Sequence, residues 1–135
     1  MLVVDASVTL AWIHAEERTS AINAIAERVA AEGCIVPSIW SSEIANAVVM
    51  AMRRKRMTQA GLDEALATLR RMPIKIEQTG RELAWRYALP MAIRHKLTVY
   101  DATYLELAVR KQLPLATLDD ELIAAARAEG LAVLP

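Results

Sequence analysis

Short apolar runs alternate along the chain with longer segments in which apolar residues recur every three or four positions. The runs fall at residues 1–5, 34–36, 74–76, 114–117 and 131–134, and the first of them ends in Asp5. A run of this length that is apolar throughout, or that alternates, predicts a short strand of a sheet buried on both faces. The pattern therefore predicts five strands.

The segments between these runs have the spacing of amphipathic helices. Helical spacing covers residues 8–30 with an interruption near 15–19, and Ser7 is placed to cap this segment. Thr58 is placed to cap a later helix, and the 79–82 segment has the pattern of a capping box. The helix that this capping box opens is predicted to run to about residue 95, and the remaining helices are predicted over residues 38–56, 59–72, 101–111 and 119–129.

Strands separated by helices indicate a parallel sheet covered on both faces. The length of 135 residues corresponds to one domain, and no internal repeat, linker or low-complexity segment divides the chain. We therefore predict a three-layer α/β fold formed by residues 1–135.

Composition narrows the class of protein. The hydrophobic fraction of 55% excludes intrinsic disorder, and no apolar run approaches the ~20 residues of a membrane span. No signal-peptide layout opens the chain, and the single cysteine, Cys34, cannot build a disulfide framework. A cytoplasmic protein without membrane association is expected.

The net charge of zero conceals an uneven distribution. Residues 1–50 carry two basic and six acidic side chains, residues 51–111 carry thirteen and six, and residues 112–135 carry one and four. A basic middle segment suits a polyanionic ligand, although solvated helix faces produce the same pattern.

Four carboxylates fall at one edge of the predicted sheet. Asp5 ends the first strand, Glu43 lies in the first turns of the helix after the second strand, Asp101 begins the helix before the fourth strand, and Asp119 follows that strand. Ligands of open parallel sheets bind at this edge, so the four side chains are expected to converge.

Converging carboxylates repel one another, and a divalent cation removes that repulsion. Oxygen ligands without His or Cys suit Mg²⁺ or Mn²⁺ and argue against zinc or a thiol nucleophile. Such ions activate water and stabilise the leaving oxygen in phosphodiester hydrolysis. The residues thus indicate metal-assisted hydrolysis, although Asp101 and Asp119 taken singly are also ordinary helix-start residues.

Four further residues have spacings that place them near the carboxylates. Ser7 and Thr117 lie two positions from Asp5 and Asp119, and Asn46 and Tyr104 lie three positions after Glu43 and Asp101. We expect Asn46 to orient Glu43 and Tyr104 to reach the rim of the cleft, although Ser7, Asn46 and Thr117 are individually also common caps and turn formers. Asp120 is an alternative to Asp119, but its side chain points the other way if the chain is still extended there.

Four segments in this order resemble the PIN domain family, specifically the VapC toxin ribonucleases of bacterial type II toxin–antitoxin pairs. They are Val-Val-Asp-Ala-Ser-Val at the start, the segment from Pro37 to Asn46, the segment from Tyr100 to Ala108, and Leu-Ala-Thr-Leu-Asp ending at Asp119. Each motif is short, but together they span nearly the whole chain.

The resemblance implies a sheet of strand order 3-2-1-4-5 and a metal site formed by Asp5, Glu43, Asp101 and Asp119. It also implies a Mg²⁺- or Mn²⁺-dependent endoribonuclease that is a homodimer and is neutralised by a VapB-like antitoxin. Arg53, Arg54, Arg56, Arg86 and Arg94 are then candidates for contact with RNA or with the antitoxin, although cations near helix ends also have a purely structural explanation.

Two other classes remain at this point. One is a non-catalytic PIN-fold module that binds RNA or protein, which the four intact acidic positions disfavour. The other is a signalling receiver domain, which needs paired acids at the end of the first strand and a lysine after the last strand. Here Asp5 stands alone, and the chain reads Val-Leu-Pro at its end.

Overall fold

The computed structural model describes residues 1–135 and contains one five-stranded sheet in which every neighbouring pair of strands is parallel. The strand order is β3-β2-β1-β4-β5, which confirms the predicted α/β sheet and the order that the resemblance implied. The strands are β1 (Leu2–Val4), β2 (Cys34–Pro37), β3 (Ile74–Glu77), β4 (Leu115–Ala116) and β5 (Val133–Leu134).

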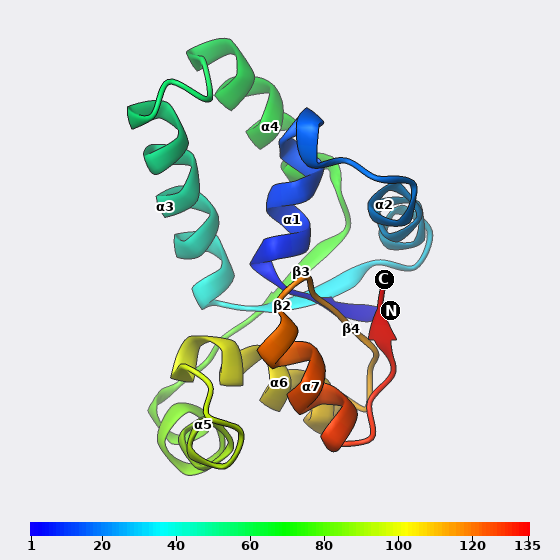
Figure 1. Ribbon diagram of the computed structural model, residues 1–135, viewed down its shortest axis with the longest axis vertical. Helices are drawn as coiled ribbons and strands as arrows, with labels where there is room; N and C mark the ends of the chain where they lie inside the picture. The colour runs from blue at the N-terminus through cyan, green and yellow to red at the C-terminus, as the bar shows by residue number, and fades with distance from the viewer.

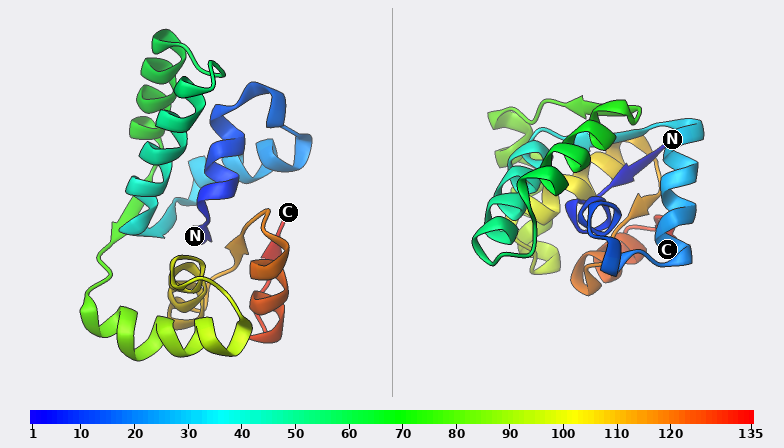
Figure 2. Two further views of the ribbon diagram at one scale, coloured as in Figure 1. Left: turned by 60° about the vertical axis from the view of Figure 1, so that its left-hand side comes forward. Right: turned by 90° about the horizontal axis from the view of Figure 1, so that it is seen from above.

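Helices cover both faces of the sheet, so the predicted three layers are present (Figure 1). On one face lie α1 (Ala6–Ile13), η1 (Ala15–Glu17), α2 (Ser20–Glu32), α3 (Ile39–Arg53) and α4 (Gln59–Arg71). On the other lie η2 (Leu83–Ala88), α5 (Leu89–His95), α6 (Val99–Lys111) and α7 (Asp120–Ala128). Figure 2 shows that α3 and α4 form an antiparallel pair that extends well beyond the sheet.

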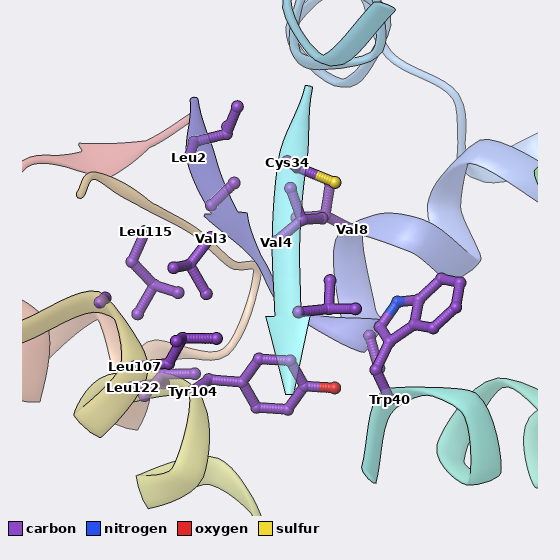
Figure 3. Close-up of a cluster of buried hydrophobic side chains, with 14 of the residues drawn as sticks. Leu2, Val3, Val4, Val8, Cys34, Trp40, Tyr104, Leu107, Leu115 and Leu122 are labelled. Carbon is purple, nitrogen blue, oxygen red and sulfur yellow. The ribbon is translucent and has the colours of Figure 1, made fainter. Parts of the chain in front are cut away.

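The central strand β1 is the middle of the hydrophobic core. Its three residues are completely buried, and the core cluster around them contains 29 residues from the sheet and from helices on both faces. Figure 3 shows part of this cluster, in which Tyr104 and Leu107 of α6 approach the sheet from one side and Trp40 of α3 lies on the other. Burial of apolar side chains on both faces explains why β1 is apolar throughout.

Several predicted helix boundaries are confirmed. The interruption near 15–19 separates α1 from α2, and Thr58 caps α4 by accepting the Gly61 N–H at 3.1 Å. Gly33 and Gly130, with φ of +77° and +79°, follow α2 and α7 as predicted.

Two predicted helix starts and one predicted capping box are wrong, although the helix predicted to open at residues 79–82 does begin there, at Arg81. Helix α6 begins at Val99 rather than at Asp101, because the Thr98 hydroxyl accepts the Asp101 N–H at 3.1 Å and thereby caps the helix earlier. Ser7 lies inside α1 and its hydroxyl is bound elsewhere. The capping box does not form, because the chain at Thr79 is still tied to the end of β2, where the Thr79 N–H donates to Ser38 Oγ at 3.2 Å.

None of the helices has both the length and the apolar content that crossing a membrane requires.

Gly33 allows the turn between α2 and β2. Its φ of +77° and ψ of 166° lie in a region that is essentially restricted to glycine, and an added Cβ would lie 3.3 Å from the Pro73 carbonyl oxygen.

We therefore expect Gly33→Ala to lower the free energy of unfolding by about 1–3 kcal/mol, measured by urea denaturation. Gly80→Ala is the control, because an added Cβ there has no neighbour within 4 Å. Equal midpoints for the two variants would contradict this account.

Candidate active site

Asp5 is held directly at the end of the central strand by two hydroxyl groups. Its side chain is 4% exposed, and its Oδ2 accepts hydrogen bonds from Ser7 Oγ at 2.7 Å and from Thr117 Oγ1 at 2.8 Å. Because a buried carboxylate without hydrogen bonds is costly, these two donors stabilise the charge and fix the orientation of the group. The predicted bond of Ser7 to this carboxylate is observed, whereas Thr117, which was predicted to lie beside Asp119, donates its hydroxyl to Asp5.

The same two hydroxyls also bind the loop that follows β4. Ser7 Oγ accepts the Leu118 N–H at 3.0 Å, and Thr117 Oγ1 accepts the Asp119 N–H at 3.1 Å. Each hydroxyl thus connects Asp5 to the backbone of this loop, which brings Asp119 toward the first strand although 114 residues separate the two acids in the sequence. Asp5 Oδ1 has no hydrogen-bond partner and is not completely buried.

Asp119 has a structural role as well as a place in the acidic cluster. It is the N-cap of α7, and its Oδ1 accepts the Leu122 N–H at 2.9 Å. The bond uses one carboxylate oxygen and leaves Oδ2 without a hydrogen bond. Asp120, the alternative at this position, is exposed and is the first residue of α7.

Glu43 is oriented by Tyr104 and not by Asn46. The Tyr104 hydroxyl donates to Glu43 Oε1 at 2.6 Å, whereas Asn46 is exposed and makes no side-chain hydrogen bond to Glu43. Tyr104 is completely buried, so the expectation that it lies on the rim of the cleft is wrong. Burial and the adjacent glutamate raise the pKa of Tyr104 far above its usual range, which keeps its proton on the phenol.

The carboxylates influence one another electrostatically. Burial raises the pKa of Glu43, and the negative charges of Asp5 and Asp101 raise it further, while the Tyr104 hydrogen bond opposes this shift. Burial also raises the pKa of Asp101, followed by the charge of Asp5 and then by those of Asp119 and Glu121. All four predicted acids therefore lie within electrostatic range of at least one other member of the group.

Glu121 was missed by the sequence reasoning. It lies in the first turn of α7, where acidic residues are common because they interact favourably with the helix dipole, so its presence carried no functional signal. Its charge nevertheless acts on Asp101, which places it beside the four predicted acids.

The chemistry of these side chains fits a hard divalent cation. The donors are carboxylate oxygens alone, and Asp5 and Asp119 each offer one oxygen that no protein group binds. No three acidic, histidine or cysteine side chains are already arranged around a single point. Burial is the largest cause of the raised pKa values of Glu43 and Asp101, and the negative charges of neighbouring carboxylates raise both values further.

The predicted basic residues differ in whether another side chain already holds them. Arg53, Arg54 and Arg56 are exposed at the tip of the α3–α4 pair and form no ion pairs, and Arg53 is ten residues, or about 15 Å of helix, from Glu43. By contrast, Arg94 is paired with Glu129 at 2.8 Å, and Arg86 lies over the Tyr87 ring at 5.8 Å.

Comparison with known proteins gives consistent matches. The profile of the PIN domain family matches residues 2–128. Ribonuclease VapC9 of Mycobacterium tuberculosis and VapC ribonuclease Mb0985 of Mycobacterium bovis are each 32% identical to the chain over 119 residues, covering 88% of this chain and 86% of theirs. Ribonuclease VapC3 of Mycobacterium tuberculosis is 32% identical over 122 residues, covering 90% of this chain and 84% of its own.

A solved structure agrees in fold. The crystal structure of PAE2754 from Pyrobaculum aerophilum superposes with a TM-score of 0.73 at 23% identity, covering 98% of this chain and 87% of that one.

The repulsion within the cluster gives a stability prediction. Folding raises the pKa of Glu43, so this side chain ionises at a lower pH in the unfolded chain than in the folded protein. Neutral Glu43 therefore contributes stability below the ordinary glutamate pKa. This contribution is lost as the pH rises through the pKa of Glu43 in the folded protein. We expect Glu43→Gln to raise the melting temperature in EDTA at neutral pH, since Gln still accepts the Tyr104 hydrogen bond. The gain should vanish near pH 4.

The measurement is differential scanning fluorimetry across this pH range. Glu64→Gln provides the control, because Glu64 is exposed on α4 and has no ion pair. A lower melting temperature for Glu43→Gln at neutral pH would show that the ionised carboxylate stabilises the fold.

Proposed function

The chain belongs to the PIN domain family, and from this premise we propose that it is an endoribonuclease that uses Mg²⁺, or Mn²⁺ in its place, to hydrolyse phosphodiester bonds of RNA. The proposal is supported by the grouping of Asp5, Glu43, Asp101 and Asp119 at one edge of the sheet, where burial first and neighbouring negative charges second raise the pKa values of Glu43 and Asp101. The relatives named as ribonucleases support RNA as the substrate. We propose further that the protein is the toxin of a type II toxin–antitoxin pair.

The residues that would hold the cation are Asp5, Asp101 and Asp119, with Glu43. When bound, a divalent cation would polarise the phosphoryl oxygen and would lower the pKa of the attacking water molecule. Hydrolysis then adds one water across one phosphorus–oxygen bond.

The remaining residues of the cluster position these acids. Ser7 and Thr117 occupy Asp5 Oδ2, so that Oδ1 is the oxygen available to a ligand. Tyr104 holds Glu43 Oε1 in the same way from the core of the protein. Pre-oriented ligands of this kind reduce the cost of assembling the site around a cation.

The free arginines at the tip of the α3–α4 pair suit contact with RNA phosphates. Arg53, Arg54 and Arg56 are exposed and form no ion pair, so they are available to a polyanion, with Glu16 and Glu17 lining the same hollow as Arg54 and Arg56. Arg94 is less available because Glu129 holds it.

A VapB-like antitoxin and a homodimer are part of the same proposal. Trp85, Leu89 and Ile93 recur on one side of η2 and α5 with exposed fractions of 66%, 41% and 72%, and exposed apolar groups of this kind are commonly covered by protein partners.

Sedimentation at twice the chain mass of 14.9 kDa would support the dimer, and sedimentation at the chain mass would contradict it.

Neutralising a carboxylate of the cluster tests the activity. Asp5→Asn and Asp101→Asn should each reduce Mg²⁺-dependent cleavage of RNA by at least about a hundredfold, because each removes a charged ligand while keeping the side-chain shape. EDTA should abolish cleavage by the wild type, and both variants should relieve growth arrest on expression.

Asp63→Asn is the matched control for this assay, because Asp63 is exposed on α4 and its only side-chain hydrogen bond joins it to Gln59 on the same helix. Circular dichroism of each variant is the check that the variant is folded. Full activity in both cluster variants would remove the assignment, and absence of cleavage by the wild type would favour the alternative of a non-catalytic PIN-fold module that binds RNA or protein.

Replacing Arg53, Arg54 and Arg56 by alanine tests the phosphate contacts. The triple variant should bind single-stranded RNA more weakly, and the slope of log Kd against log salt concentration should fall by up to about 2, because each lost contact with a single strand removes about 0.7. Fluorescence anisotropy with labelled RNA in EDTA measures both quantities. The control replaces three cations elsewhere, Arg70, Arg71 and Lys75, by alanine. An equal change in this control would show that net charge alone causes the effect and would contradict specific phosphate contacts at the tip of the α3–α4 pair.

A further inference from the structure

The hydrogen bond between Tyr104 and Glu43 joins the core of the protein to the acidic cluster. Tyr104 is completely buried, and its hydroxyl points away from α6 (Figure 3) and donates to Glu43 Oε1 at 2.6 Å. Burial and the adjacent glutamate raise the pKa of Tyr104 far above its usual range, so the phenol remains a donor. Because the ring is fixed in the core, it holds Glu43 Oε1 and leaves Oε2 without a hydrogen-bond partner.

The same pattern occurs at two other acids of the cluster. Asp5 Oδ2 accepts the Ser7 and Thr117 hydroxyls at 2.7 and 2.8 Å. Asp119 Oδ1 accepts the Leu122 N–H at 2.9 Å. In both residues the second carboxylate oxygen has no hydrogen-bond partner. Three acids from separate parts of the chain are thus each held through one oxygen and keep the other one free.

The number of free oxygens on each carboxylate affects which cation a site accepts. Ca²⁺ takes about six to eight oxygen ligands and often binds a carboxylate through both of its oxygens. Mg²⁺ demands a nearly octahedral arrangement of closer ligands, keeps several water molecules and is usually bound by one or two carboxylates. A carboxylate oxygen that already accepts a hydrogen bond is a weaker ligand, because the donor proton and the cation compete for its lone pairs.

We propose that these hydrogen bonds restrict Asp5, Glu43 and Asp119 to contact with a cation through one oxygen each, and that the site thereby discriminates against Ca²⁺ in favour of the smaller Mg²⁺ and Mn²⁺. Tyr104 provides this restriction at Glu43. It is a positioning residue, because it touches a metal-binding side chain and acts on the cation only through that side chain. The inference rests on the proposed metal-dependent function and adds the groups that select the ion.

Isothermal calorimetry of the metal-free protein with MnCl₂ and with CaCl₂, in the absence of RNA, tests this selection. The wild type should bind Mn²⁺ more tightly than Ca²⁺. Tyr104→Phe should lose about tenfold in Mn²⁺ affinity, because groups that orient metal ligands typically contribute about ten- to hundredfold. Its Ca²⁺ affinity should be equal or higher, because both Glu43 oxygens are then free. The ratio of Kd for Ca²⁺ to Kd for Mn²⁺ should therefore fall by at least about tenfold.

Ser7→Ala tests the same restriction at a different acid and serves if Tyr104→Phe does not fold. It leaves Asp5 Oδ2 with one hydroxyl donor in place of two, so the ratio should fall here as well. Tyr100→Phe is the matched control, because Tyr100 lies one turn earlier in α6, is 62% exposed and makes no hydrogen bond through its hydroxyl. Both of its affinities should equal those of the wild type.

The outcomes separate this inference from the proposed function. An unchanged ratio in Tyr104→Phe, with both affinities reduced by one factor, would overturn the inference by showing that the hydroxyl supports the site without selecting the ion. An unchanged ratio in Ser7→Ala, or equal affinities of the wild type for the two ions, would also overturn it. None of these results contradicts Mg²⁺-dependent cleavage of RNA by the wild type.

Failure of the proposed function gives different results. If the wild type binds Mn²⁺ with this selectivity but cuts no RNA, the ribonuclease proposal fails and the selection of the ion is supported. If the wild type binds neither ion, the metal-dependent function fails and the inference fails with it.

Discussion

The carboxylate of Asp5 is the group on which the arrangement of the candidate site depends. It is buried at the end of the central strand, and two hydroxyl groups bind its Oδ2 while they also accept backbone N–H groups after β4. The negative charge that these bonds stabilise is the one that acts on both Glu43 and Asp101. Asp5 therefore connects the ends of two strands, and its charge contributes to the raised pKa values of Glu43 and Asp101.

This arrangement stores an unfavourable interaction at one edge of an otherwise consistent fold. The core around β1 is apolar, whereas the acids are held close by hydrogen bonds from Tyr104, Ser7 and Thr117 although their charges repel. Natural sequences accept such local conflict mainly at functional sites, where a ligand relieves it. A divalent cation would relieve this conflict, and membership of the PIN domain family is consistent with that interpretation.

The sequence predicted most of the framework and less of the contacts. Five apolar runs located all five strands, and the position of the four acids at strand and helix ends follows from the topology of a parallel sheet. Contacts between distant segments were harder to predict from the sequence. Helical spacing suggested Asn46 as the partner of Glu43, whereas the partner in the structure is Tyr104, 61 residues away. Glu121 was not predicted, because an acidic residue in the first turn of a helix is common. The start of α6 was predicted two residues too late, because the capping role of Thr98 was not recognised.

Titration of the metal-free protein with Mn²⁺ by isothermal calorimetry tests the central claim most directly, because it measures whether the repelling carboxylates accept a cation independently of any RNA substrate. The account predicts saturable binding by the wild type and affinity reduced by at least about tenfold in Asp5→Asn and in Asp101→Asn. Absence of binding by the wild type, or equal affinity in the three proteins, would contradict the account.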